Sequence, residues 1–248
     1  MNYYSQENPY ASPLGIAALP AALAEESART AFIRRTYIHV FGAILLFVGI
    51  DAAIFTLVPS DTLKNSMLMI FGGRFGWLAV IGTFMLVTWL AQSLASSQAS
   101  VPLQYAGLLM YVVAEALFFV PLLWIANNYA PGAIPAAGML TLLMFGGLTA
   151  FVLFTKADFT SWGPYLWWAG IAAFGVVIAA IFFNFALGVW FAAAMVGLAS
   201  AYILYDTSNI LHRYRTDQHV AASLALFASV ATLFYYLLRL LMEFNRRD

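Results

Sequence analysis

Hydrophobic residues run through this chain in seven long blocks, each of roughly the 20 residues that are needed to cross the hydrocarbon core of a bilayer. The breaks between the blocks are short and contain Pro, Gly, Asn or charged residues, which are typical of turns. The pattern therefore predicts an all-α integral membrane protein whose seven transmembrane helices pack antiparallel to their neighbours in sequence. The blocks cover residues 36–58, 75–95, 103–126, 134–154, 165–183, 188–211 and 220–242.

The first 30 residues do not follow this pattern, because they are largely polar and contain prolines. They lack the basic start and the unbroken apolar stretch of a signal peptide. We therefore expect a polar, partly disordered tail over 1–30 and a seven-helix transmembrane domain over 31–248. The positive-inside rule places Arg29, Arg34 and Arg35, and with them the N-terminus, in the cytoplasm.

The composition does not alter the predicted helices, but it argues against a soluble protein and against several kinds of functional site. The chain is 63% apolar and 9% charged, against roughly 45–50% and about 25% in soluble domains. It has no cysteine and a formal net charge of zero, so neither a thiolate metal site nor a nucleic-acid partner is indicated. No phosphate-binding, zinc-hydrolase or serine-hydrolase motif occurs in the sequence. We expect neither an enzyme nor a cofactor.

Acidic residues inside the predicted spans are the first candidates for a functional site. An ionisable side chain near the bilayer centre costs about 2.5–3.5 kcal/mol on insertion scales, so such residues are seldom accidental. Glu115 lies near the middle of the third block and Asp206 lies deep in the sixth. Asp51 lies closer to the end of the first block, where we expect a polar position at the membrane rim.

The last block carries a narrow polar stripe. On a helix its polar residues fall within about 80° of arc, so they must face protein or a water-filled path. An alternative is that they only form hydrogen bonds with neighbouring helices. The stripe consists of Ser229, Thr232, Tyr236, Arg239 and Glu243.

The sixth block has two distinct faces. At about 100° per residue, Arg213 shares the face of Asp206. The opposite face carries the small residues Ala193, Gly197 and Ala201, a pattern that lets helix backbones approach closely. We therefore expect this helix to lie inside the bundle, away from lipid.

Several strings, in this order and spacing, resemble the Bax inhibitor family (the transmembrane Bax-inhibitor motif proteins) in its bacterial branch. The resemblance covers about residues 30–242, and it rests on the combination of strings rather than on any one of them. The strings are Phe32-Ile-Arg-Arg-Thr-Tyr37, Pro121, Thr155-Lys-Ala-Asp-Phe159, a Trp-Gly-Pro turn, Ala201-Tyr-Ile-Leu-Tyr-Asp-Thr207 and Leu233-Phe-x-x-Leu-Leu-Arg239.

This resemblance implies a fold in which six helices surround a central C-terminal helix. It also implies calcium leak across the membrane, controlled by pH through two aspartates. One of them matches Asp206. The other belongs ten residues before the arginine that matches Arg239, and that position is Ser229 here. Another acidic residue of the family, four positions earlier, is replaced by Ala225.

Without the second carboxylate, the surroundings of Asp206 are open to several interpretations. It can be neutral and hydrogen-bonded to Ser229 or Thr232, or it can pair with Arg213 or Arg239. Glu115 can also supply a replacement carboxylate. Calcium prefers six to eight oxygen ligands, so Asp206 with nearby hydroxyls would form only a weak, transit site for the ion.

The sequence therefore favours a cation (calcium) leak channel whose gating responds to pH through a buried carboxylate. The expected location is the bacterial inner (cytoplasmic) membrane, with several passes, and the expected partners are the lipid bilayer and calcium ions or protons. The alternative is a non-transporting regulator that binds and modulates a membrane-anchored AAA protease, which the missing aspartate favours. A coupled transporter is less favoured, because inverted halves are not evident.

Overall fold

The computed structural model describes residues 19–71, 74–97 and 100–245. In these residues the chain forms α-helices joined by short connections, with no strand. The helices are α1 (Glu26–Leu57), α2 (Ser60–Phe71), α3 (Arg74–Ala95), α4 (Val101–Tyr129), α5 (Ala133–Thr155), α6 (Gly163–Phe183), α7 (Val189–His212) and α8 (His219–Asn245), with the short 3-10 turns η1 (Ala21–Leu23) and η2 (Thr160–Trp162).

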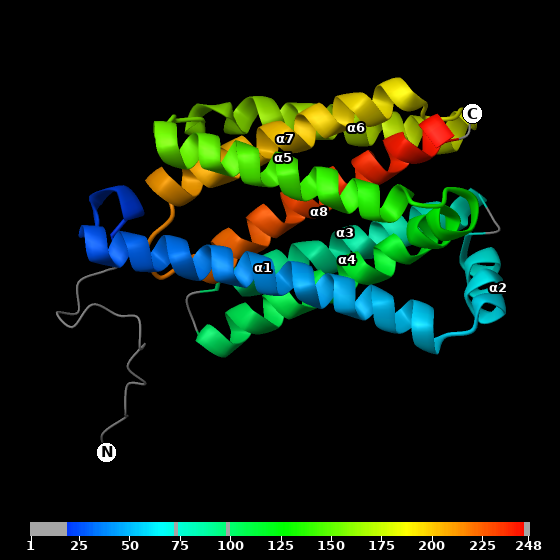
Figure 1. The fold of residues 1–248 in the computed structure, drawn as a ribbon, viewed down its shortest axis with the longest axis horizontal. Coiled ribbons are helices and arrows are strands. Elements are labelled where there is room, and N and C mark those ends of the chain that lie inside the picture. The colour runs from blue at the N-terminus through cyan, green and yellow to red at the C-terminus, as the bar shows by residue number, and fades with distance from the viewer. Residues whose placement is uncertain (1–18, 72–73, 98–99, 246–248) are drawn as a thin grey trace, which may run out of the picture.

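Seven of these helices are long and apolar enough to cross a membrane, and each corresponds to one of the predicted blocks. They run along one common direction (Figure 1). We name the end of the bundle at which α1 begins the N-side, and the end at which α8 finishes the C-side. The all-α, seven-span prediction is confirmed. The sequence analysis missed α2, a 12-residue helix at the C-side that connects α1 to α3.

The last helix is the most enclosed of the seven, with 61% of its membrane window buried inside the protein. It packs against α1, α3, α4, α5 and α7. By contrast, α6 packs chiefly against α7 and η2, and only 11% of its window is buried. The complete ring of six helices around α8 that the resemblance implies stays a prediction, because α6 lies at the periphery.

Local sequence signals explain where several helices begin and end. Pro102 occupies the first turn of α4, where its missing N–H removes no helical hydrogen bond. Gly132 precedes α5 at φ 81°, a left-handed conformation that glycine adopts without steric cost. Asn184 ends α6 at φ 55°, and asparagine tolerates this region better than most residues.

The antiparallel helices α3 and α4 approach each other closely at Gly107. A Cβ atom at Gly107 would lie 2.6 Å from the backbone oxygen of Ala91 and 2.6 Å from the backbone nitrogen of Ala95. Both alanines are buried. Gly107 therefore lets the two backbones approach closely, as small residues do at membrane helix interfaces.

The small-residue face that was expected to pack tightly on α7 instead faces outward. Ala193 and Gly197 are exposed, and nothing lies within 4 Å of a Cβ atom built on Gly197. The buried positions of α7 are concentrated on its other face and in its last two turns. The expectation that α7 lies wholly away from lipid was therefore wrong: small residues permit close packing but do not require it.

The start of the described chain is attached to the N-side of the bundle. Ala21 is fully buried, and its N–H donates to the backbone oxygen of Tyr214 at 2.8 Å. The first helix begins at Glu26, within the span 1–30 that the sequence assigned to the tail. The expectation of a disordered tail falls largely on residues 1–18, which lie outside the described residues, and it stays a prediction.

Candidate functional site

Asp206 and Ser229 meet at the interface between α7 and α8. The Ser229 hydroxyl donates a hydrogen bond to Oδ2 of Asp206 at 2.5 Å. Both residues are almost completely buried, at 7% and 8% exposed. Helix geometry explains the meeting, because Asp206 lies six residues before the end of α7 and Ser229 lies ten residues into α8, on helices that run antiparallel from a short connection.

A cavity of about 490 Å³ opens beside this pair on the N-side. Asp206 and Ser229 contribute to its wall, and the other polar lining comes from the end of α3, from α7 and α8, and from the connection between those two helices. These residues are Gln92, Ser96, Tyr202, Tyr214, Thr232 and Tyr236. A buried carboxyl group therefore faces a space that is large enough to hold several water molecules.

A second and larger cavity, of about 1130 Å³, lies toward the C-side. It contains one acidic and one basic side chain, Glu115 and Arg239, in a wall that is otherwise mostly apolar. Glu115 is 6% exposed, and the Tyr111 side chain interacts with it from one turn earlier on α4. The guanidinium of Arg239 donates from Nη2 to the backbone oxygen of Leu187 at 2.8 Å.

The two cavities adjoin, because they share part of their lining. The shared residues come from α6, α7 and α8, and include Thr232 and Tyr236 of the predicted polar stripe. Together the cavities extend from Ser96 and Tyr214 near the N-side to Asn184 and Arg239 near the C-side. The shared residues are Phe174, Val177, Met195, Thr232 and Tyr236.

The structure selects one of the alternatives that the sequence left open for Asp206. Its side-chain partner is Ser229, while the Thr232 hydroxyl donates to the backbone oxygen of Ala228 at 2.9 Å. Arg213 is exposed, and Arg239 bonds to the α6–α7 connection. In the described part of the chain, neither arginine forms an ion pair with Asp206. Glu115 contributes to the adjoining cavity but not to the lining of the Asp206 cavity.

No cluster of three or more His, Cys, Asp or Glu side chains suited to a metal occurs among the described residues. Asp206 and the Ser229 hydroxyl supply far fewer oxygens than the six to eight that calcium prefers. A cation at Asp206 would therefore keep most of its water shell, as an ion in transit does.

The α5–α6 connection, which contains the Thr-Lys-Ala-Asp-Phe string, is held against the end of α7. The Phe159 N–H donates to Oγ of Ser208 at 2.9 Å. The Thr160 N–H donates to Oδ1 of Asp158 at 2.8 Å. The hydrogen bond from Thr160 lowers the pKa of Asp158 below its usual value, because it stabilises the ionised carboxylate.

Two histidines form an interhelical cluster with a tyrosine. Tyr105 of α4 lies between them, with its Oη 2.9 Å from Nε2 of His39 and 3.2 Å from Nε2 of His219. His219 is only 1% exposed. The cluster joins α1, α4 and α8, and sequence spacing gave no signal for it, because its members are distant along the chain.

Asp51 is also more deeply placed than expected. It was predicted at a polar rim, but it is 6% exposed, and neither carboxyl oxygen has a hydrogen-bond partner among the described residues. Its position, seven residues before Val58 at the C-cap of α1, gave the rim prediction. Burial came from the neighbouring helices, which sequence position alone does not reveal.

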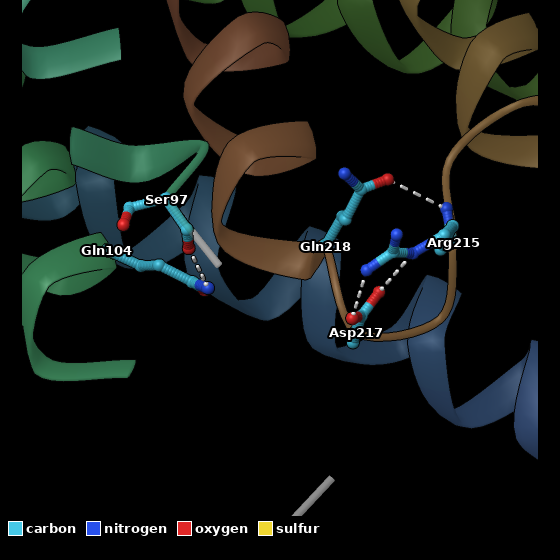
Figure 2. A network of polar contacts seen from close by, with 5 residues as sticks. All are labelled: Ser97, Gln104, Arg215, Asp217 and Gln218. Carbon is cyan, nitrogen blue, oxygen red and sulfur yellow. Dashed lines mark hydrogen bonds and ion pairs between the residues drawn. The ribbon is translucent and has the colours of Figure 1, made fainter. Parts of the chain in front are cut away.

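Polar contacts stabilise the α3–α4 and α7–α8 connections at the N-side (Figure 2). Arg215 forms a two-pronged ion pair with Asp217, at 3.1 Å and 2.7 Å, and its backbone N–H donates to Oε1 of Gln218 at 3.0 Å. At the α3–α4 connection, Gln104 in the first turn of α4 donates to the backbone oxygen of Ser97 at 2.8 Å. The contacts of Arg215 stabilise the turn that follows Tyr214, a residue of the cavity wall.

Comparison with known proteins matches the sequence of this chain to a family. Residues 29–246 match the sequence model of the family described as "Inhibitor of apoptosis-promoting Bax1". Bax inhibitor 1 of Schizosaccharomyces pombe is 26% identical over 92% of this chain and 82% of its own length. The protein Cj0236c of Campylobacter jejuni is 29% identical over 87% and 90%, and the Golgi anti-apoptotic protein of vaccinia virus is 25% identical over 88% and 88%. With seven helices able to span a membrane and a family match over most of its length, the chain belongs to the Bax inhibitor family of multi-pass membrane proteins.

Proposed function

We propose that this protein is a cation leak pathway, with calcium as the cargo, and that its opening responds to pH through Asp206. The observation that carries the proposal is the position of Asp206, a buried carboxyl group in the wall of a cavity that adjoins a second cavity leading to the C-side. Intramembrane carboxyl groups that face such spaces typically belong to ion or proton pathways.

The charge of Asp206 supplies the gating. When the carboxyl group is ionised it attracts a hydrated cation into the cavity, and the Ser229 hydroxyl stabilises the charge by donating its hydrogen bond. When the carboxyl group is protonated, that attraction is lost and the wall of the cavity carries no charge. Cation flux should therefore rise with pH over the range in which Asp206 loses its proton.

The hydroxyl at position 229 also shapes the response. Two adjacent carboxyl groups share a proton and titrate as a pair, whereas Asp206 and Ser229 contribute a single titrating group. The proposed leak should therefore follow a single-proton pH profile. Glu115 lies in the adjoining cavity and is not a direct partner of Asp206.

Calcium flux into liposomes tests the proposal directly. The purified chain would be reconstituted into vesicles that contain a calcium indicator, and external calcium would be added at pH values from 5 to 8. We expect protein-dependent flux that increases with pH. Flux no greater than in protein-free vesicles at every pH would refute the leak.

A second function is favoured by one observation, the lone carboxyl group at the site. A non-transporting regulator of a membrane-anchored AAA protease needs a stable fold and an exposed binding surface but no ion path. Affinity purification from a bacterial host that contains such a protease separates the two. Specific co-purification of the protease, with no calcium flux from the same preparation, would support the regulator instead.

A further inference from the structure

The larger cavity is open to the side of the bundle. Its walls belong on one side to α3, α4 and α8 and on the other side to α6. Because α6 packs chiefly against α7 and η2, no extensive contact closes the seam between α3 and α6 in the described part of the chain. Several large apolar residues of the wall are exposed, among them Trp77 at 39%, Met85 at 49% and Phe183 at 79%.

The lining of this cavity matches the hydrocarbon of a bilayer rather than water alone. Aromatic and aliphatic side chains form most of the wall. Two of the contributing helices, α3 and α6, have only 17% and 11% of their membrane windows buried inside the protein. A space of about 1130 Å³ is slightly larger than the roughly 300–1,000 Å³ of typical small-molecule pockets. An apolar chain that enters between α3 and α6 would bury itself without disturbing any packed interface.

A cation lies at the C-side end of the same cavity. Arg239 comes twenty residues after His219 on α8, which is about 30 Å along the helix and so close to the membrane surface opposite the start of α8. One of its five N–H groups is donated to the backbone oxygen of Leu187, and its side chain also interacts with that of Tyr235. In the described residues no carboxylate forms an ion pair with it. Trp77, from the first turn of α3, lies at the same end, where tryptophan typically meets lipid headgroups.

We propose that this cleft binds one anionic phospholipid of the bilayer, with its phosphate on Arg239 and an acyl chain lying between α3 and α6. The guanidinium is suited to a phosphate because it presents several N–H donors in a plane. The apolar walls account for the chain, and the unpaired charge accounts for the anionic headgroup. The lipid would occupy the larger cavity, so the proposed ion path through that cavity would be open only when the lipid is absent.

Lipid binding to the purified protein in detergent tests the site. Phosphatidylglycerol and phosphatidylcholine with identical oleoyl chains would be titrated separately, with retained lipid measured by native mass spectrometry and stability measured by thermal unfolding. We expect one tightly retained phosphatidylglycerol and a larger rise of Tm than phosphatidylcholine gives. Equal retention and equal Tm shifts for the two lipids would overturn the proposal. This comparison uses the natural chain, so it does not depend on whether any variant folds.

Two matched pairs of variants locate the bound lipid. Arg239→Gln should weaken phosphatidylglycerol retention about tenfold, since it removes a charge-assisted contact, whereas Arg34→Gln, at an exposed cation near the start of α1, should not. Val177→Trp places a bulky side chain in the cleft and should displace the lipid. Val176→Trp, next to it on the lipid-facing surface at 41% exposed, should leave binding intact.

Other results would identify a different occupant. If Val177→Trp retained phosphatidylglycerol as well as the natural chain does, the lipid would lie elsewhere and the proposal would be wrong. If oleate alone bound and raised Tm while phosphatidylglycerol did not, the cleft would hold a free fatty acid. If the natural chain and the variants all failed to retain either lipid, the proposal would be wrong and the cleft would contain only water.

Discussion

The hydrogen bond from Ser229 to Asp206 is the feature on which the site depends. At 2.5 Å it is as short as the hydrogen bonds that hydroxyls form with ionised oxygens. A hydroxyl can also accept from a protonated carboxyl group, so Ser229 fits both charge states of Asp206. Neither nearby arginine is needed to hold the pair in place, since Arg213 is exposed and Arg239 bonds elsewhere.

Replacing that hydroxyl by a carboxyl group should introduce pH sensitivity into the stability of the fold. In Ser229→Asp, two carboxyl groups would lie at the distance of the present hydrogen bond, sharing a proton at low pH and repelling each other when both ionise. We expect Tm in detergent to fall as pH rises from 5 to 8. Ser229→Asn, of similar size but without charge, should show no such slope. If Tm changed with pH equally in the two variants, positions 206 and 229 would not face each other.

Asp158 should stabilise the α5–α6 connection only while it is ionised. Its pKa is lowered in the folded protein, so its contribution is complete above the unfolded pKa of about 4 and disappears as pH falls through the folded pKa. Asp158→Ala should lower stability by no more than about 1 kcal/mol, because the residue is exposed. The Tm difference between this variant and the natural chain should shrink between pH 5 and 3. A difference that stays constant with pH would show that the charge plays no part.

At the scale of helices, the sequence predicted the positions of the membrane-spanning helices well. It predicted poorly which helices pack closely against each other. All seven spans were found because about 20 consecutive apolar residues have few alternatives to crossing a membrane. The short helix α2 was missed, because its mixed polar and apolar residues resemble a connection. Small residues on α7 suggested close packing, yet the close approach occurs at Gly107, where α3 and α4 meet. Composition shows where packing is permitted, and only the neighbouring helix determines where it happens.

The α3–α4 contact can be tested with one methyl group. Gly107→Ala would place a Cβ atom 2.6 Å from backbone atoms of α3, which cannot rotate away as a side chain could. We expect a loss of about 2 kcal/mol of stability, typical of overpacking. Gly82→Ala on α3, where nothing lies within 4 Å, is the control and should leave Tm unchanged or slightly higher. If both substitutions behaved alike, the helices would be less closely packed than the structure indicates.

At the scale of the whole molecule, the two adjoining cavities could not have been predicted from the sequence. The sequence identified Asp206, Glu115 and the polar stripe of the last helix as candidates, and most of these residues line the cavities. It could not indicate that α6 would stand apart from α3 and leave a lateral opening, because that depends on how all seven helices share their apolar surface. The His39–Tyr105–His219 cluster was missed for a similar reason, since its members come from three helices.

The central claim is that Asp206 carries the function through its charge rather than the stability of the fold. Asp206→Asn tests it most directly, because the amide oxygen can still accept the hydrogen bond from Ser229 while the titratable charge is gone. Tm in detergent and calcium flux in liposomes would be measured on the same preparation. We predict a Tm within a few degrees of the natural chain and the loss of calcium flux and of its pH dependence. Unchanged flux with an unchanged pH profile would contradict the account.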